Sequence, residues 1–337
     1  MGVWSACGSQ SATLKTAVII EESKTVTRDL QGSDPERMNP ENFNKYCERL
    51  FQKEDTNVFI STISGAHMIK EEYPCMAAVD RACQNIDRHR ARAIWLNYSE
   101  GKPEKTIVLV GKGLTYDTGG ADIKAGGIMA GMHRDKGGAS AVAGFMHAIN
   151  LLKPKNVQIC AGLAVCRNSV GSEAYVADEI IRARSGIKLR VGNTDAEGRM
   201  AMVDLLCYAK ERCLNEKWAD PEFYTIATLT GHACLAYGTY SGIVANGPYN
   251  RAKLDRKLQE SGEIVGDQFD VGTLRREDFE YHMGKDEQTD VLQVRLKLEI
   301  QGHLIPLPIF YINGIYFRLE ITHRVELQEV IKDQQHS

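Results

Sequence analysis

Hydrophobic positions in the middle of the chain fall into short runs that polar or amphipathic segments separate. Apolar runs of three to five residues between such segments are typical of buried strands. We therefore expect strands at 58–60, 93–96, 107–110, 157–161, 189–191 and 224–227. Residues 1–38 are polar and weakly patterned, and they contain a turn cluster near Gly32.

Helical spacing appears between the expected strands. Apolar side chains recur at helical intervals after Pro40, and the segments 139–152 and 198–212 are amphipathic. Strands that alternate with helices indicate an α/β layer structure, in which the sheet is largely buried.

Composition restricts the classes of function. The chain has 337 residues, with 41 Lys and Arg against 44 Asp and Glu, a net charge of -3 and 43% hydrophobic residues. This balance disfavours nucleic acid or an anionic membrane surface as the main partner. No apolar run reaches the ~18 residues that a membrane-spanning helix needs. Nine scattered cysteines without a CxxC pair favour reduced thiols and a cytoplasmic protein.

Glycine is concentrated in one region. Of the 30 glycines, nine fall between Gly111 and Gly138, directly after the expected strand 107–110. Such loops expose backbone and permit tight turns. At the carboxyl ends of sheet strands they are where open α/β proteins place their sites.

Carboxylates and cations gather in this region and in the segment 193–200. Asp195 and Glu197 are two residues apart, so in extended backbone they would project to the same side. With Asp117 and Asp135 of the glycine-rich region, they make a group of four carboxylates. The members of such a group repel one another in a dry site unless cations neutralise them. Two divalent ions about 3.5–4 Å apart are one known solution, and they serve hydrolysis. An Asp-x-Glu pair alone is also compatible with a solvated surface turn. A phosphate-binding loop is disfavoured because the GxxxxGK[ST] spacing is absent.

The sequence Asn-Thr-Asp-Ala-Glu-Gly-Arg-Met at 193–200 resembles the hallmark octapeptide of the leucyl aminopeptidase (cytosol aminopeptidase) family. Ala-Thr-Leu-Thr-Gly at 227–231 is similar to a second family segment, and weaker similarity runs from about Arg28 to about Asp290. The resemblance implies a three-layer helix–sheet–helix peptidase domain with a central mixed, largely parallel sheet. It also implies a metal-dependent exopeptidase that removes the N-terminal residue of peptides.

The resemblance assigns a role to particular positions of this chain. It implies metal ligation by Lys112, Asp117, Asp135, Asp195 and Glu197. It gives Lys124 and Arg199 the role of catalytic cations. It implies substrate contacts from Met132, Asn193, Ala196, Thr228, Leu229 and Gly231. The implied cofactors are two divalent ions, Mn or Zn, with bicarbonate assisting as a general base on a metal-bridging water. Lys124 and Arg199 would stabilise the developing oxyanion.

Departures from the family pattern set the expected domain division. We expect a linker remnant at 1–38 without a preceding N-terminal domain, a catalytic domain at 39–290, and a divergent C-terminal segment at 291–337. The family resemblance implies a homo-oligomer, a hexamer or a trimer, and we expect the apolar run 304–317 to be buried in it. A catalytically weak or silent homologue that acts as a binding or structural subunit is the alternative, and metal content would distinguish the two.

Overall fold

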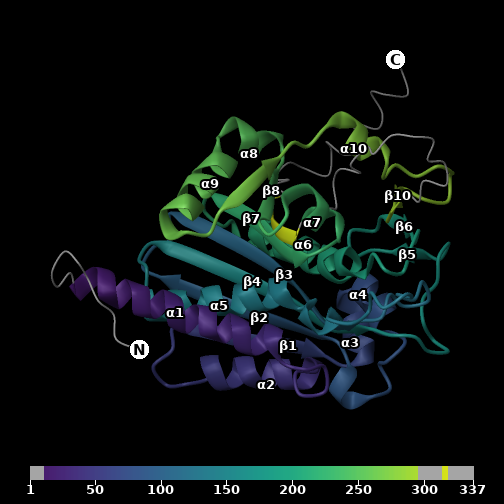
Figure 1. Ribbon diagram of the computed structural model, residues 1–337, viewed down its shortest axis with the longest axis horizontal. Coiled ribbons are helices and arrows are strands. Elements are labelled where there is room, and N and C mark those ends of the chain that lie inside the picture. The colour runs from purple at the N-terminus through teal and green to yellow at the C-terminus, as the bar shows by residue number, and fades with distance from the viewer. Residues whose placement is uncertain (1–10, 295–312, 318–337) are drawn as a thin grey trace.

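The computed structural model describes residues 11–294 and 313–317 (Figure 1). Most of the run 304–317 therefore lies outside the described residues, as does most of the expected segment 291–337. The strands are β1 (Val58–Ser64), β2 (Arg92–Glu100), β3 (Lys105–Asp117), β4 (Val157–Asn168), β5 (Ile180–Arg182), β6 (Lys188–Arg190), β7 (Pro221–Thr228), β8 (Ser241–Ala245), β9 (Phe269–Gly272), β10 (Val291–Leu292) and β11 (Asn313–Phe317).

Helices connect and cover these strands. They are α1 (Ser11–Gly32), α2 (Pro40–Phe51), α3 (Ala66–Glu72), α4 (Pro74–Asp80), α5 (Gly137–Leu152), α6 (Glu197–Glu216), α7 (His232–Tyr237), α8 (Gly247–Arg251), α9 (Leu254–Val265) and α10 (Arg276–Glu280), with short 3-10 turns at Asp87–His89 and Met132–Arg134. The expected helices and strands between residues 40 and 228 are confirmed, although most extend beyond the apolar runs that predicted them.

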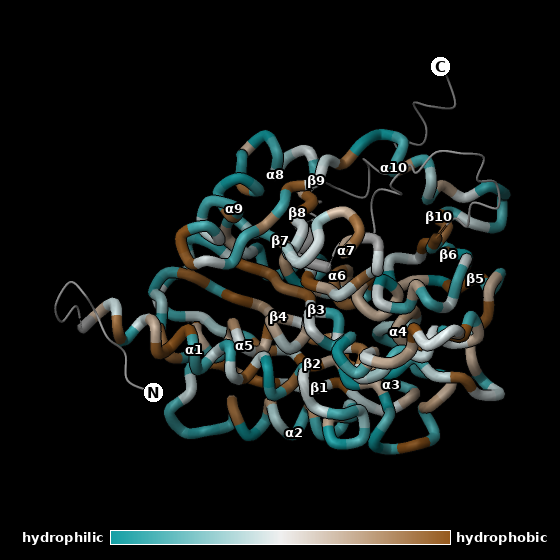
Figure 2. The backbone as a smooth tube through the Cα atoms, in the orientation of Figure 1, coloured by the Kyte–Doolittle hydropathy of each residue, from teal (hydrophilic) through white to brown (hydrophobic). Residues whose placement is uncertain are grey.

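The described strands form a large mixed sheet of order β1-β2-β4-β3-β7-β11-β8-β9 and a small sheet of order β10-β6-β5. In the large sheet β3 pairs in parallel with both β4 and β7, whereas β1, β2 and β4 pair in antiparallel fashion. Figure 2 shows long stretches of hydrophobic residues along the central strands. Buried strands of this kind read as nearly continuous apolar runs.

One hydrophobic core lies on each face of the large sheet. On one face, buried residues of α1, α2 and α5 pack on the strands, among them Leu30, Phe43 and Met146. On the other face α4 and α6 pack on the strands through residues such as Met76 and Leu205. The expected α/β class, with a mixed sheet between helices, is therefore confirmed. No helix of the described residues is long and apolar enough to cross a membrane.

The helix α1 was not evident from the hydrophobic pattern. Its 22 residues bury few apolar side chains, such as Ile19, Val26 and Leu30, so a weak pattern along the sequence still gives a packed helix. Figure 1 shows α1 lying along α5. At its end, Gln31 donates to the carbonyl of Arg134 at 3.3 Å, so this helix reaches the turn that carries Asp135.

The contact between α1 and α5 gives a first testable prediction. A Cβ at Gly144 would lie 2.2 Å from Thr27 Oγ1 and 2.6 Å from the carbonyl oxygen of Ser23. Alanine normally stabilises a helix relative to glycine by about 1 kcal/mol, but overpacking costs about 1–3 kcal/mol. We therefore expect Gly144→Ala to lower the urea midpoint of unfolding.

Gly32→Ala is the matched control, since a Cβ at this last residue of α1 meets nothing within 4 Å. It should leave the midpoint near that of the wild type. Equal stability of the two variants would contradict the close packing of α1 on α5.

Candidate metal centre

The candidate site lies at the carboxyl ends of three neighbouring strands. Because β3 is parallel to both β4 and β7, their last residues, Asp117, Asn168 and Thr228, lie at one edge of the sheet. The loop 118–136 starts from this edge, at the end of β3, and leads to α5. The turn before α6 meets the same edge. This is the region in which open α/β sheets bind ligands.

Lys112 is the buried cation of the site. It projects from within β3 and is 2% exposed. Its Nζ lies 2.8 Å from Asp135 Oδ2 and 2.7 Å from Glu197 Oε1, and it donates to the carbonyl of Thr228 at 2.9 Å. A Cβ at Gly198 would come within 2.4 Å of Lys112 Cε, so the glycine that follows Glu197 leaves the space that this side chain occupies.

Two further carboxylates, those of Asp117 and Asp195, form a tight group with Glu197. Asp117, Asp195 and Glu197 each offer an oxygen, and these oxygens lie within 4.8 Å of one another. Lys124 stands beside them, since its Nζ lies 3.0 Å from Asp117 Oδ2 and also contacts Asp195 Oδ1. The site therefore brings together the five expected ligands and Lys124.

Neighbouring donors fix the orientation of these carboxylates. Asn168 Nδ2 donates to Asp117 Oδ1 at 2.8 Å, and the backbone N–H of Gly119 donates to the same oxygen at 2.9 Å. Thr228 Oγ1 donates to Asp135 Oδ1 at 2.8 Å. Glu197 is the first residue of α6, where the partial positive charge of the helix N-terminus favours a carboxylate.

The charges of the site do not cancel. When all four are ionised, the carboxylates face only the two ammonium groups of Lys112 and Lys124, which leaves two negative charges in a mostly buried space. Burial raises the pKa of Glu197 to about 8 and the pKa of Asp135 to about 6, and neighbouring carboxylates, Asp117 foremost, add to both shifts. Burial also raises the pKa of Asp195, with Asp117 as the next cause.

Lys112 shows how acidic the surroundings are. Burial alone would lower its pKa, but Asp135, Glu197 and Asp117 together raise the pKa above its ordinary value. A lysine can bind a metal only as the neutral amine, so ligation by Lys112 requires dications that outweigh these carboxylates.

The donor set fits divalent metal ions. Glu197 Oε2 is buried and has no hydrogen-bond partner among the described residues, although its neighbours are charged. Such an oxygen is costly to bury unless a ligand occupies the space beside it. Carboxylate oxygens of this number and closeness, with negative charge to neutralise, suit divalent cations.

The expected substrate residues surround this group to different degrees. Thr228 contacts both Lys112 and Asp135, while Asn193 Oδ1 accepts from the backbone N–H of Asp195 at 2.7 Å. Met132 is half-buried and opens the 3-10 turn that leads to Asp135.

For the other three expected substrate residues, the contacts described are with groups other than the charged side chains. Ala196 precedes Glu197, and its carbonyl accepts from Gln293. Leu229 packs against the core on the α6 side, and Gly231 is exposed at the start of α7.

Two polar residues of the site were not singled out as site residues by sequence reasoning. Asn168 Nδ2 donates to Asp117 and also to the carbonyl of Thr194 at 3.1 Å. Gln293 is buried and contacts the turn before α6. Asn168 directly follows an apolar strand, which was a usable signal. The carbonyl of Gln293 accepts a hydrogen bond from the side chain of Arg199, which lies 94 positions earlier in the chain. Nothing in the sequence around Gln293 therefore indicates this role.

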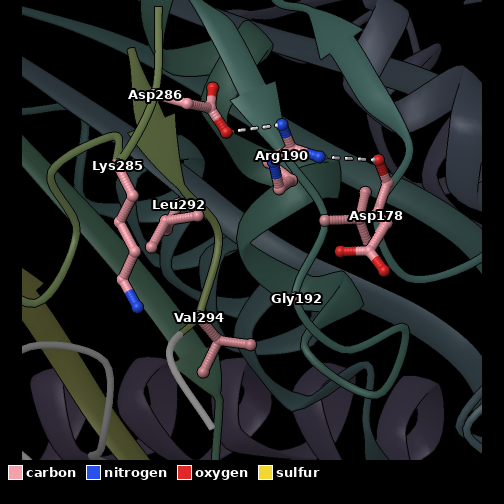
Figure 3. A pocket seen from close by; sticks show the side chains of 8 residues that line it. Asp178, Arg190, Gly192, Lys285, Asp286, Leu292 and Val294 are labelled. Atoms are coloured by element: carbon pink, nitrogen blue, oxygen red, sulfur yellow. Dashed lines mark hydrogen bonds and ion pairs between the residues drawn. The ribbon is translucent and has the colours of Figure 1, made fainter. Parts of the chain in front are cut away.

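An open pocket of about 390 Å³ adjoins the site without belonging to it (Figure 3). Its lining residues are Asp178, Arg190, Val191, Gly192, Lys285, Asp286, Leu292 and Val294. None of the expected ligands or catalytic cations is among them. Its lining residue Gly192 places the pocket beside the turn that carries Asp195.

Comparison with known proteins identifies the family. A sequence model of the cytosol aminopeptidase family, catalytic domain, matches residues 25–297, which is most of the chain. The chain belongs to the cytosol aminopeptidase family. The match covers every residue of the charged group described above, from Lys112 to Glu197.

Curated relatives agree with this family. A Caenorhabditis elegans protein that carries an aminopeptidase name is 41% identical over 308 residues, which cover 89% of this chain and 58% of that protein. Proteins named "Probable cytosol aminopeptidase" are 34% identical in Helicobacter hepaticus (76% of this chain, 52% of the relative) and 35% identical in Persephonella marina (69% and 44%). The chain spans about half the length of these relatives.

The raised pKa of Glu197 predicts how the metal-free protein responds to pH. A carboxyl group whose pKa is raised by folding, here from 4.5 to about 8, holds its proton more tightly in the folded state than in the unfolded chain. Its contribution to stability is therefore full below about pH 4.5 and is lost as the pH rises through about 8. In EDTA, we expect the free energy of unfolding to fall more steeply between pH 7 and 8.5 in the wild type than in Glu197→Gln.

The comparison with Glu197→Gln removes this titrating carboxyl group and keeps the other charged side chains of the site. Burial lowers the pKa of Lys136 to about 8, so Lys136 titrates in the same range in both proteins and cancels in the difference. Urea denaturation at several pH values measures both slopes. Identical slopes would contradict a raised pKa at Glu197.

Proposed function

We propose that the protein is a metal-dependent aminopeptidase that hydrolyses the N-terminal residue from peptides. The observation that carries this proposal is the mostly buried group of four carboxylates around Lys112 and Lys124, at the positions of the family motif. Membership of the cytosol aminopeptidase family supports it. The alternative, a catalytically silent homologue, is less favoured because the full set of charged side chains is present and in contact.

Two ions would share this set of ligands. One would be held by Asp117, Asp195 and Glu197, whose oxygens already lie within 4.8 Å of one another. The other would be held by Lys112, Asp135 and two shared carboxylates, Asp117 and Glu197. When bound, two divalent ions would lower the pKa of a water molecule and polarise the scissile carbonyl.

The two catalytic cations would act on the developing negative charge. The side chain of Lys124 is mostly buried but 12% exposed. Its ammonium group can therefore contact both the carboxylates and a bound peptide. Arg199 is held by a hydrogen bond of 2.7 Å from Nη1 to the carbonyl of Gln293. We propose that both stabilise the oxyanion, and that together they can hold a small anion such as bicarbonate, which would assist as a base.

The substrate would lie against the surrounding turns. In this proposal Met132 and Ala196 line the pocket for the first side chain, while Asn193, Thr228, Leu229 and Gly231 face the peptide backbone. The neutral α-amine of the peptide would reach the metals, which restricts cleavage to the N-terminus.

Further parts of the proposal rest on the family resemblance. One part is the domain division into a linker at 1–38, a catalytic domain at 39–290 and a C-terminal segment at 291–337. A second part is a cytoplasmic location, which the name of the relatives supports. The third is assembly into a homo-oligomer, a hexamer or a trimer. Sedimentation velocity measures the assembly. A purely monomeric, fully active protein would contradict this part alone.

Substitutions separate ligands from catalytic cations. We expect Asp135→Asn to lose bound metal and activity together, because an amide is a poorer, uncharged ligand. Lys112→Ala should lose the more weakly held metal. Lys124→Ala and Arg199→Ala should keep near-normal metal content while kcat falls about 10²–10³-fold, the usual cost of an oxyanion stabiliser. Elemental analysis and hydrolysis of a leucine anilide measure the two effects.

Chelation provides the test on the unmodified protein. Activity should disappear in EDTA and return with Mn²⁺, Co²⁺ or Zn²⁺. Asp178→Asn is a control, since this exposed carboxylate is outside the charged group. Full activity of a metal-free sample, or loss of all metal in Lys124→Ala, would show that the assigned roles are wrong.

A further inference from the structure

Gln293 is a buried polar residue at the end of the small sheet. It directly follows β10, is 2% exposed, and extends the parallel pairing with β6 through a hydrogen bond from its N–H to the carbonyl of Arg190 at 2.9 Å. The small sheet lies outside the large sheet that carries the strand ends of the site. Its contact with the metal centre therefore needs a separate explanation.

The amide side chain of Gln293 is bonded to both ends of the turn before α6. Its Oε1 accepts from the backbone N–H groups of Gly192 at 2.9 Å and Asn193 at 3.0 Å. Its Nε2 donates to the carbonyl of Ala196 at 3.0 Å. Asp195 lies between these anchor points and Glu197 follows them, so the three bonds span the turn that presents two expected ligands.

The backbone of Gln293 also meets a catalytic cation. Its carbonyl oxygen accepts from Arg199 Nη1 at 2.7 Å. A single residue thus contacts the ligand-bearing turn through its side chain and Arg199 through its main chain. A carboxylate at this position could accept but not donate, and an apolar side chain could do neither, so the amide alone satisfies all three backbone groups.

The middle of the turn is held separately at Thr194, whose N–H donates to Asp122 at 2.7 Å and whose carbonyl accepts from Tyr175 at 2.7 Å. Gln293 therefore adds support at the two ends of the turn.

The open pocket of Figure 3 lies beside Gly192 and Val294, and its Arg190 is already bonded to Asp286 at 2.8 Å. A Cβ at Gly192 would meet the carbonyl oxygen of Val294 at 2.1 Å, so the chain after Gln293 approaches the turn by backbone contact.

We propose that Gln293 is a positioning residue that clasps the turn 192–196 and Arg199, and so sets the placement of Asp195 and Glu197. The consequence for catalysis rests on the proposed aminopeptidase function, whereas the clasp itself does not. Residues that orient metal ligands from behind commonly change metal affinity about 10–100-fold when they are replaced.

The test compares two variants of Gln293 with a matched control. Gln293→Met keeps the length of the side chain and removes its three hydrogen bonds. Gln293→Asn keeps the amide but withdraws it by one methylene. Asp286→Asn weakens the ion pair with Arg190 in the same small sheet and leaves Gln293 untouched. Each full-length protein is measured by amide hydrogen exchange of 192–199 in EDTA, by Mn²⁺ titration calorimetry, and by peptide hydrolysis at saturating Mn²⁺.

Both Gln293 variants should exchange faster than wild type in 192–199 and bind Mn²⁺ at least about tenfold more weakly. At saturating Mn²⁺, kcat should fall more than KM rises, because Arg199 and the ligands act on the reacting group. Asp286→Asn should match the wild type in exchange and in Mn²⁺ affinity.

Two outcomes would overturn the clasp. In the first, Gln293→Met has a lower melting temperature, but its hydrogen exchange and its Mn²⁺ affinity match those of Asp286→Asn. Gln293 would then have a purely structural role. The other, if Gln293→Met does not fold, is wild-type behaviour of Gln293→Asn. A wild-type protein that fails to hydrolyse peptides would defeat the proposed function, and the exchange experiment would still decide on the clasp.

Discussion

Four carboxylates, three of them buried, gather around Lys112 and Lys124, and this is the constraint on which the rest of the site depends. Charged groups in a mostly dry space are tolerated only when they are paired and hydrogen-bonded. Here Lys112 and Lys124 pair with all four, yet two negative charges remain. Burial first, and then the charge of Asp117, raises the pKa of Glu197, and a divalent cation is the simplest group that neutralises the remaining charge.

The fold meets this constraint by bringing distant segments to one sheet edge. Parallel pairing aligns the ends of β3, β4 and β7, which supply Asp117, Asn168 and Thr228. The start of α6 adds Glu197 with a favourable helix dipole. Glycines allow the close approach: without Gly198 the stem of Lys112 would not fit, and Gly138 lets α5 approach within contact of the Ile226 carbonyl.

Elements outside the large sheet hold the loops that carry the remaining ligands. The end of α1 contacts both sides of Asp135. Gln31 donates to the carbonyl of Arg134, and Lys136 donates to the carbonyl of Ser33, the residue after α1, at 3.1 Å. At the other flank, Gln293 bonds the turn around Asp195. The family match from 25 to 297 includes both of these supports, so they lie within the shared catalytic domain.

Sequence by itself determined the local features. Apolar runs predicted the central strands because buried strands need continuous hydrophobic side chains, and the octapeptide at 193–200 indicated the family and the ligand positions. Only the tertiary structure decided that α1 is a packed helix, that Asn168 orients Asp117, and that Gln293 reaches Arg199. These depend on contacts between residues far apart in the chain, and such contacts leave no periodicity or spacing that a single sequence can reveal.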